Sequence, residues 1–272
     1  MDLLISSILT PIISIYTYKE SHPNWISATC DNFIKNTYMY ALSILLILWT
    51  ILSYFRYYGI VLYILKNIDY LFNRSMLFII FIAILYFVLL ASLIYIIKHI
   101  DPRKILLKHI VLFIFIILFA LLLCPAYIFF QNLILISLII AIIIGIITYF
   151  IIMRYPNLIT KEHSQIIFIM FISLFVLNII FAISIPFILI KNPMIVYFGF
   201  LFFAISYIIL LSFRLMIHHQ NIKEHSIICN DNTHYPDYIN ESIRLFITIV
   251  NLILQIIKLI FLGKNKKMFI KK

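Results

Sequence analysis

The sequence predicts an all-α integral membrane protein, a seven-helix bundle of six spans and a short seventh helix. Of its 272 residues, 65% are hydrophobic, 11% are charged and only four are glycine. A soluble globule of this size would therefore lack the polar residues to cover its surface. The apolar residues also gather in uncharged runs of about 20, the length at which a helix crosses the hydrocarbon layer. Because a helix satisfies its own backbone hydrogen bonds in lipid, we interpret these runs as helices.

The first two spans are defined by their flanking charges. Residues 36–54 are uncharged up to Arg56, and residues 75–97 are uncharged between Arg74 and Lys98. Each run is long enough for one crossing.

The chain before the first span, residues 1–35, is expected to form an interfacial N-terminal segment. Residues 3–18 are apolar, but they follow Asp2 instead of a basic start and contain Pro11. A signal peptide or an additional span is the alternative.

The third to sixth spans complete a polytopic membrane domain over residues 36–262. The stretch between Lys108 and Arg154 is uncharged and too long for one crossing. A helix would stop and turn at its internal polar or proline positions, which are Pro125, Gln131 and Asn132. The fifth and sixth spans, residues 164–190 and 192–213, are separated by a short polar hairpin at Lys191, Asn192 and Pro193.

The seventh helix is expected to be short. Arg244 and Lys258 enclose only residues 245–257, a length more typical of a re-entrant or buried segment unless both cations extend to the interface. A basic C-terminal tail, residues 263–272, follows.

The net charge of +11 indicates a membrane surface as partner and no nucleic acid. The lysines lie in short loops and in the tail, where basic residues flank spans and face anionic lipid. The three cysteines, Cys30, Cys124 and Cys229, are odd in number and far apart. We therefore expect free thiols and neither a disulfide framework nor a metal set.

No catalytic motif is present. The sequence contains no GxSxG, no HExxH, no pair of intramembrane aspartates and no Gly-rich phosphate loop. We therefore expect no enzyme, no cofactor and no metal site. Solvated interfacial histidines are favoured over a metal site made from the polar residues after the sixth span, which include His225, Asp231, His234 and Asp237.

The end of the sixth span carries the first candidates for pore lining or gating. Arg214 and His218 are four residues apart and share one helix face. In one interpretation Arg214 contacts lipid phosphates and His218 marks the interface; in the other, both line a polar cavity that biases gating. His219 lies about 100° around the helix from His218, so these two histidines cannot form one metal-binding face.

The seventh helix carries a polar stripe. Thr248, Asn251 and Gln255 recur at spacings of three and four. In lipid such a stripe is expected to turn inward, where it either joins helices or lines a conduit.

Five segments in this order resemble the Bax inhibitor / Lifeguard family, the transmembrane Bax inhibitor motif proteins. The first two, DNFIKNTYMYALSILLILWTILSYF (31–55) and DPRKILLKHIVLFIFIILFALLL (101–123), are similar to the starts of its first and third helices. IHHQNI (217–222) lies on the family's Tyr-Asp-Thr-Gln-Leu-Ile motif. DYI (237–239) and LFITIV (245–250) stand where the family has Glu-Tyr-Ile and Leu-Tyr-x-Asp-Ile-Ile. The resemblance covers residues 32 to about 262.

The resemblance implies a gate that this chain has changed. The family's two functional aspartates share a proton, form a latch with an arginine of the second helix and gate a pH-sensitive calcium leak. His218 and Thr248 replace them here, and residues 75–97 contain no arginine. Protonation of His218 would oppose calcium entry, so we expect a weakened or altered leak. The pore and gating candidates are His218, Thr248, Arg214, His219, Gln220, Asn251 and Gln255.

The expected function is that of a Lifeguard-like, non-enzymatic protein of the endoplasmic reticulum or Golgi membrane. It would modulate cell death and calcium or ion homeostasis. Its partners would be membrane lipids, calcium or protons, and other membrane proteins of the cell-death pathway. The alternative is an unrelated polytopic transporter or a respiratory-chain membrane subunit from an AT-rich genome; a seven-helix receptor is a third class.

Overall fold

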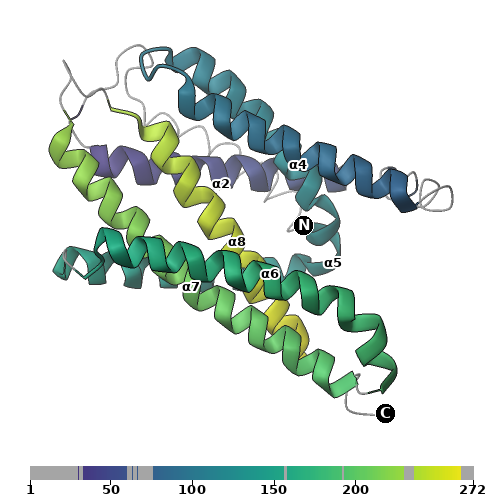
Figure 1. The fold of residues 1–272 in the computed structure, drawn as a ribbon. Coiled ribbons are helices and arrows are strands. Elements are labelled where there is room, and N and C mark those ends of the chain that lie inside the picture. Colours follow the sequence, from purple (N-terminus) through teal and green to yellow (C-terminus); the bar gives the residue numbers. More distant parts are fainter. Residues whose placement is uncertain are drawn as a thin grey trace. The chain divides into compact units, whose positions relative to one another are not determined.

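A computed structural model of the chain describes residues 30, 33–59, 63, 66, 76–155, 158–191, 193–229 and 236–264. Every regular element within these ranges is an α-helix (Figure 1), which confirms the predicted all-α class. The helices are α2 (Phe33–Tyr57), α4 (Met76–His99), α5 (Ile105–Arg154), α6 (Lys161–Lys191), α7 (Pro193–Ile228) and α8 (Tyr238–Lys264). Residues 1–29 of the predicted interfacial segment and residues 265–272 of the tail lie outside the described residues.

The α5 helix is two helices joined at a kink. Phe130 has non-helical backbone angles, φ −121° and ψ 18°, and the candidate spans on either side are Ile105–Tyr127 and Asn132–Arg154. Pro125, which lies one turn before the kink, cannot donate its backbone hydrogen bond and weakens the helix there. The predicted break between the third and fourth spans is therefore confirmed.

Six helices in the described part of the chain are long and apolar enough to cross a membrane. The second predicted span, α4, contributes a shorter apolar stretch, Ile84–His99, within its described side chains. The chain is thus a multi-pass helical membrane protein.

The α8 helix is longer than its two cations predicted. It runs for 27 residues, about 40 Å at 1.5 Å per residue, which is enough for a full crossing. The helix extends beyond Arg244 at one end and Lys258 at the other, because each of these cations has a partner inside the protein. Arg244 lies 3.4 Å from Glu241, and the Lys258 ammonium lies 4.9 Å from the Phe200 ring centre.

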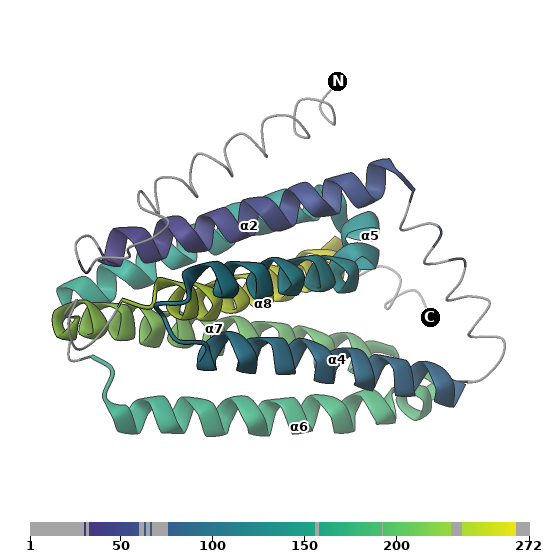
Figure 2. The same ribbon diagram turned by 90° about the horizontal axis from the view of Figure 1, so that it is seen from above.

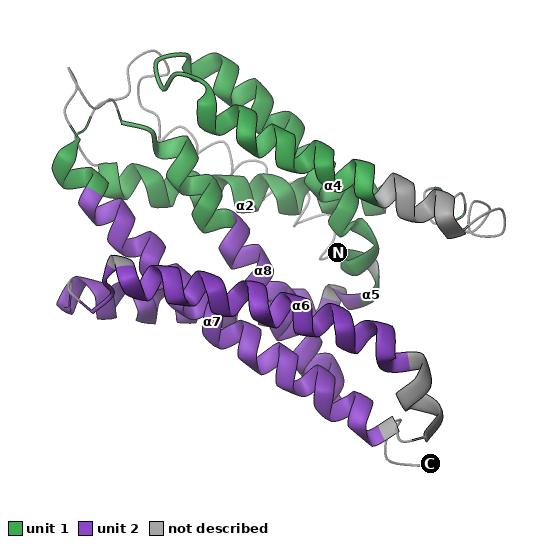
Figure 3. Cartoon of the chain, viewed as in Figure 1, with its two compact units in different colours: residues 1–129, 225–246 green, residues 130–224, 247–272 purple. Residues whose placement is uncertain are grey.

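The chain divides into two compact units, coloured separately in Figure 3. Unit 1 comprises residues 1–129 and 225–246, and unit 2 comprises residues 130–224 and 247–272.

In unit 1, α2 and the first half of α5 run in the same direction. The ring of Tyr40 lies 5.7 Å from that of His109, and the ring of Trp49 lies 5.6 Å from that of Tyr127. The later residue of α2 thus contacts the later residue of α5, which means that the two helices are parallel. The α4 helix, which connects them along the chain, adds a hydrogen bond from the Tyr86 hydroxyl to a carbonyl of α5.

The start of α8 packs into unit 1 in that same direction. Phe33 contacts Tyr238 with 5.3 Å between ring centres, and further along Phe119 contacts Phe246 at 5.7 Å. The Ser242 hydroxyl donates to a backbone carbonyl of α2 at 2.8 Å. Three alternate helices of the bundle thus begin at one end of unit 1, as expected if the chain crosses the membrane at each helix.

In unit 2, α6 and α7 form an antiparallel hairpin, visible in both views (Figures 1 and 2). Leu174 packs with Phe203, Tyr207 and Leu210 of α7 in a buried cluster. Elsewhere along α6 most of the large apolar side chains are exposed, which suits contact with lipid.

The predicted free thiols at Cys30 and Cys229 are wrong, because these two cysteines form a disulfide within unit 1. Their Cα atoms lie 5.7 Å apart across a sequence separation of 199. The bond ties a residue three positions before α2 to the residue directly after α7, a proximity that sequence spacing could not reveal. Cys124 is a buried free thiol, as predicted.

We predict that the full-length protein reacts with one equivalent of maleimide when denatured without reductant, and with three after reduction. Intact mass spectrometry measures the difference. Cys30→Ser and Cys229→Ser should each lower the free energy of unfolding by about 2–4 kcal/mol, because the unfolded chain gains conformational freedom. Three labels without reductant would contradict the pairing.

Candidate functional site

Two adjacent histidines of α7 form the centre of a buried polar cluster in unit 2. His218 and His219 are 7% and 3% exposed, so the expectation of solvated interfacial histidines is wrong for these two residues. His218 Nε2 lies 3.1 Å from the hydroxyl of Thr248 on α8. His219 Nε2 lies 3.2 Å from the hydroxyl of Thr148 on α5. Because consecutive helix residues point about 100° apart, the two rings reach two different neighbouring helices.

The Thr148 hydroxyl fixes part of this geometry. It donates to the backbone carbonyls of Ile144 and Gly145, both at 2.9 Å. Which of the two atoms donates in the contact between this oxygen and His219 Nε2 depends on the histidine tautomer. The Tyr149 ring closes the cluster edge-on, 5.8 Å from the His219 ring centre.

The remaining sequence candidates do not join this cluster. Arg214 is exposed and its guanidinium lies 5.5 Å from the centre of the Phe171 ring on α6. The Gln220 amide donates to Glu224 of its own helix at 2.9 Å. The face shared by Arg214 and His218 is therefore not one site, because the arginine packs on α6 while the histidine bonds to α8.

The polar stripe on α8 is only partly as predicted. Thr248 is buried and Gln255 is half-buried, but Asn251 is exposed. Seven residues bring a helix to within about 20° of its starting direction, whereas three leave it about 60° away. Thr248 and Gln255 therefore share a face and Asn251 lies beside it. The buried Gln255 Oε1 accepts no hydrogen bond from the described residues.

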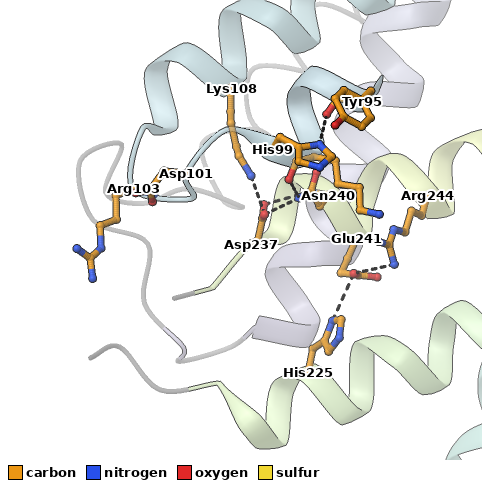
Figure 4. A network of polar contacts seen from close by, with 11 residues as sticks. Tyr95, His99, Asp101, Arg103, Lys108, His225, Asp237, Asn240, Glu241 and Arg244 are labelled. Carbon is orange, nitrogen blue, oxygen red and sulfur yellow. Dashed lines mark hydrogen bonds and ion pairs between the residues drawn. The ribbon is translucent and has the colours of Figure 1, made fainter. Parts of the chain in front are cut away.

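A second polar cluster, in unit 1, was not predicted from the sequence (Figure 4). Lys108 Nζ lies 2.6 Å from Asp237 Oδ2, with side-chain exposures of 1% and 24%. The same oxygen accepts from the Asn240 side-chain amide at 2.6 Å, and the other accepts from the Asn240 backbone at 3.3 Å. Asp237 thus caps α8 while neutralising a lysine 129 residues away.

Glu241 adds an ion-pair network beside this contact. Its side chain is 5% exposed, and its Oε1 lies 3.3 Å from His225 Nδ1 and 3.4 Å from the Arg244 guanidinium. The spacing of Glu241 and Arg244 along one helix was a usable signal. No feature of the sequence, in contrast, predicted that His225 of α7 would contact Glu241.

Neither cluster forms a metal centre. The described residues contain no group of three or more metal-ligating side chains. His225 and Asp237 are engaged by Glu241 and Lys108. Asp231 and His234 lie outside the described residues.

Comparison with known proteins offers no relative from which a site could be transferred. No family model, no curated protein and no solved structure matches this chain. The two clusters are therefore the basis on which a function can be proposed.

We predict that the two histidine contacts are separable in a double-mutant cycle. His218→Ala and Thr248→Val should couple by about 0.6 kcal/mol, and by no more than about 1.7 kcal/mol, the range for hydrogen bonds between membrane helices. The matched control pair, His218→Ala with Thr148→Val, should couple near zero. Unfolding in bicelles by a denaturing detergent measures these values, and equal coupling in both pairs would contradict the assignment.

We predict an asymmetric response of the buried ion pair. Asp237→Asn should lower the free energy of unfolding by about 3 kcal/mol, since it leaves the Lys108 ammonium buried without a counter-charge. Lys108→Met should cost only about 1–2 kcal/mol, because Asp237 keeps Asn240 and partial access to water. Lys104→Met, at an exposed lysine of the same end, is the control with no expected effect. The reverse order of the two losses would count against a buried pair.

Proposed function

We propose that this chain is a Lifeguard-like, non-enzymatic membrane protein that modulates ion and calcium homeostasis, and through it cell death. One observation carries the proposal. His218 and Thr248, which take the places of the family's two aspartates, are hydrogen bonded between α7 and α8 at 3.1 Å. The resemblance requires these two positions to meet, although they are 30 residues apart.

The chemistry of the pair determines what the gate can do. An ionised carboxylate in low dielectric attracts a divalent cation, whereas an imidazole bonded to a hydroxyl carries no negative charge. Protonation of His218 would add a positive charge and repel calcium. The proposed calcium leak is therefore weaker than one that depends on an aspartate pair.

The disulfide supports an endoplasmic reticulum or Golgi location for the proposed function. Disulfides form and persist in oxidising compartments such as the endoplasmic reticulum lumen. The proposed orientation places the Cys30–Cys229 end in the lumen and, if every helix crosses, the basic tail in the cytosol. There the tail lysines would face anionic lipid.

A polytopic transporter is the second candidate. The observation that favours it is the ion pair between Lys108, which is 1% exposed, and Asp237. Ionisable groups within membrane helices are expensive to bury and frequently mark substrate or proton pathways. In this alternative the pair, and not the histidine cluster, would be essential for flux.

We predict that restoring the acids creates the leak that the wild type lacks. Purified protein is reconstituted in liposomes that contain a calcium-sensitive dye, and calcium entry is followed at pH 6 and pH 8. Entry through the wild type should stay close to that of protein-free liposomes. The variant with His218→Asp and Thr248→Asp should leak at least about 10-fold faster at pH 8 and slow at pH 6, because two close carboxylates share a proton near neutrality.

Asn251→Asp is the matched control, since it places an acid of nearly the same shape on the exposed side of α8. It should leave entry unchanged. A wild-type leak that is acid-inhibited and as large as that of the double-aspartate variant would refute the proposal. Flux of another solute that requires Lys108 and Asp237, but not His218, would favour the transporter.

A further inference from the structure

A cavity of about 320 Å³ lies in unit 1 beside the disulfide. It is formed where four helices begin or end: Phe33 comes from the start of α2, Lys98 from the last turn of α4, Ile228 from the end of α7 and Arg244 from the first turns of α8. Its polar wall includes five residues of the network shown in Figure 4: His225, Asp237, Asn240, Glu241 and Arg244. We infer that this cavity binds a singly charged phosphodiester, supplied either by a phospholipid headgroup or by a soluble glycerophosphodiester.

The charge balance of the cavity favours an anion. Of the two carboxylates in the wall, Asp237 is neutralised by Lys108, which is buried and does not line the cavity. Glu241 is neutralised by Arg244 of the wall. The third wall charge, Lys98, is then one positive charge in surplus. His225 adds a second when it is protonated.

The carboxylates are engaged by the protein itself. Lys108 and Asn240 donate to Asp237, and Glu241 lies against His225 and Arg244. The ammonium of Lys98, in contrast, has no polar partner among the described residues, and its side chain is exposed. The group available to a ligand is therefore cationic.

A phosphodiester matches this site in charge, geometry and position. Its single negative charge equals the surplus, whereas a doubly charged monoester would be repelled by the nearby Asp237 and Glu241. Ammonium and guanidinium groups are the common phosphate partners in proteins. Basic pockets between membrane helices at their ends lie at the depth of lipid headgroups. Phe33, Ile228 and Pro236 of the cavity wall offer contact to the carbon atoms of the ester.

The α8 N-terminus is not needed for this inference. Asp237 already accepts from the Asn240 backbone there, so the helix end is capped. Recognition depends on Lys98 together with the Arg244 guanidinium. It is also independent of the histidine cluster in unit 2, so the failure of one proposal leaves the other standing.

Binding is tested on the full-length protein in maltoside micelles, which contain no phosphate. The thermal unfolding midpoint is followed during titration with two probes, glycerophosphoglycerol and short-chain phosphatidylglycerol. Lys98→Gln should raise the apparent Kd by about 10-fold, the loss expected for one charge-assisted hydrogen bond. Lys104→Gln, which removes an exposed lysine at the same end that does not line the cavity, should change the Kd less than about 2-fold.

Glu241→Gln provides a test of opposite sign. It removes one negative charge from the cavity wall, so the apparent Kd should fall. A midpoint shift with phosphatidylglycerol alone would support the site and indicate a lipid as its ligand. A midpoint shift with both probes would support the site and indicate that the soluble headgroup is sufficient for binding. No midpoint shift in the wild type with either probe, or equal losses in Lys98→Gln and Lys104→Gln, would overturn the inference.

Discussion

A polar side chain inside a membrane helix must find its partner within the protein, because lipid offers none. Two histidines at consecutive positions of α7 meet this constraint, because each is hydrogen bonded to a threonine of another helix. Each ring is directed at a different helix, so one turn of α7 is hydrogen bonded to both α5 and α8. These two contacts favour one rotation of α7 about its own axis within unit 2. Apolar packing alone selects one rotation only weakly, since isoleucine, leucine and phenylalanine recur all along α7.

The same constraint operates in unit 1 with full charges. A buried ammonium costs several kcal/mol unless it is neutralised and hydrogen bonded. Lys108 obtains both from Asp237, and that carboxylate in turn starts α8. Neutralising the lysine thus sets where a helix begins, 129 residues later. The two clusters differ in what they leave unused: the histidine cluster offers no spare charge, whereas the ion-pair network borders a cavity with a positive surplus. The proposed gating and the proposed ligand recognition therefore depend on different residues.

The sequence was sufficient for the features that depend on composition along the chain. Uncharged runs between cations located the helices, and Pro125 with Gln131 located the kink of α5, because lipid solubility and backbone hydrogen bonding act locally. The contact of His218 with Thr248 was also anticipated, but through resemblance and not through any pattern of spacing. Features that depend on which helices are neighbours could not be predicted from the sequence. The bond between Cys30 and Cys229, the pairing of Lys108 with Asp237 and the outward position of Asn251 all required the three-dimensional packing. The length of α8 was underestimated because a cation was taken as a helix boundary, whereas Arg244 and Lys258 each have a partner inside the protein.

The link between Cys30 and Cys229 also has a consequence for biosynthesis. The earlier cysteine emerges from the ribosome 199 residues before its partner, an interval of about 10–40 s at usual elongation rates. Cys124, on α5, is synthesised between the two and is a buried free thiol in the folded protein. Because Cys229 follows α7, the bond with Cys30 cannot close until α7 has been synthesised. The covalent ring then encloses six of the seven helical segments that the structure describes, and a later break in any of the loops that it spans would leave both fragments attached.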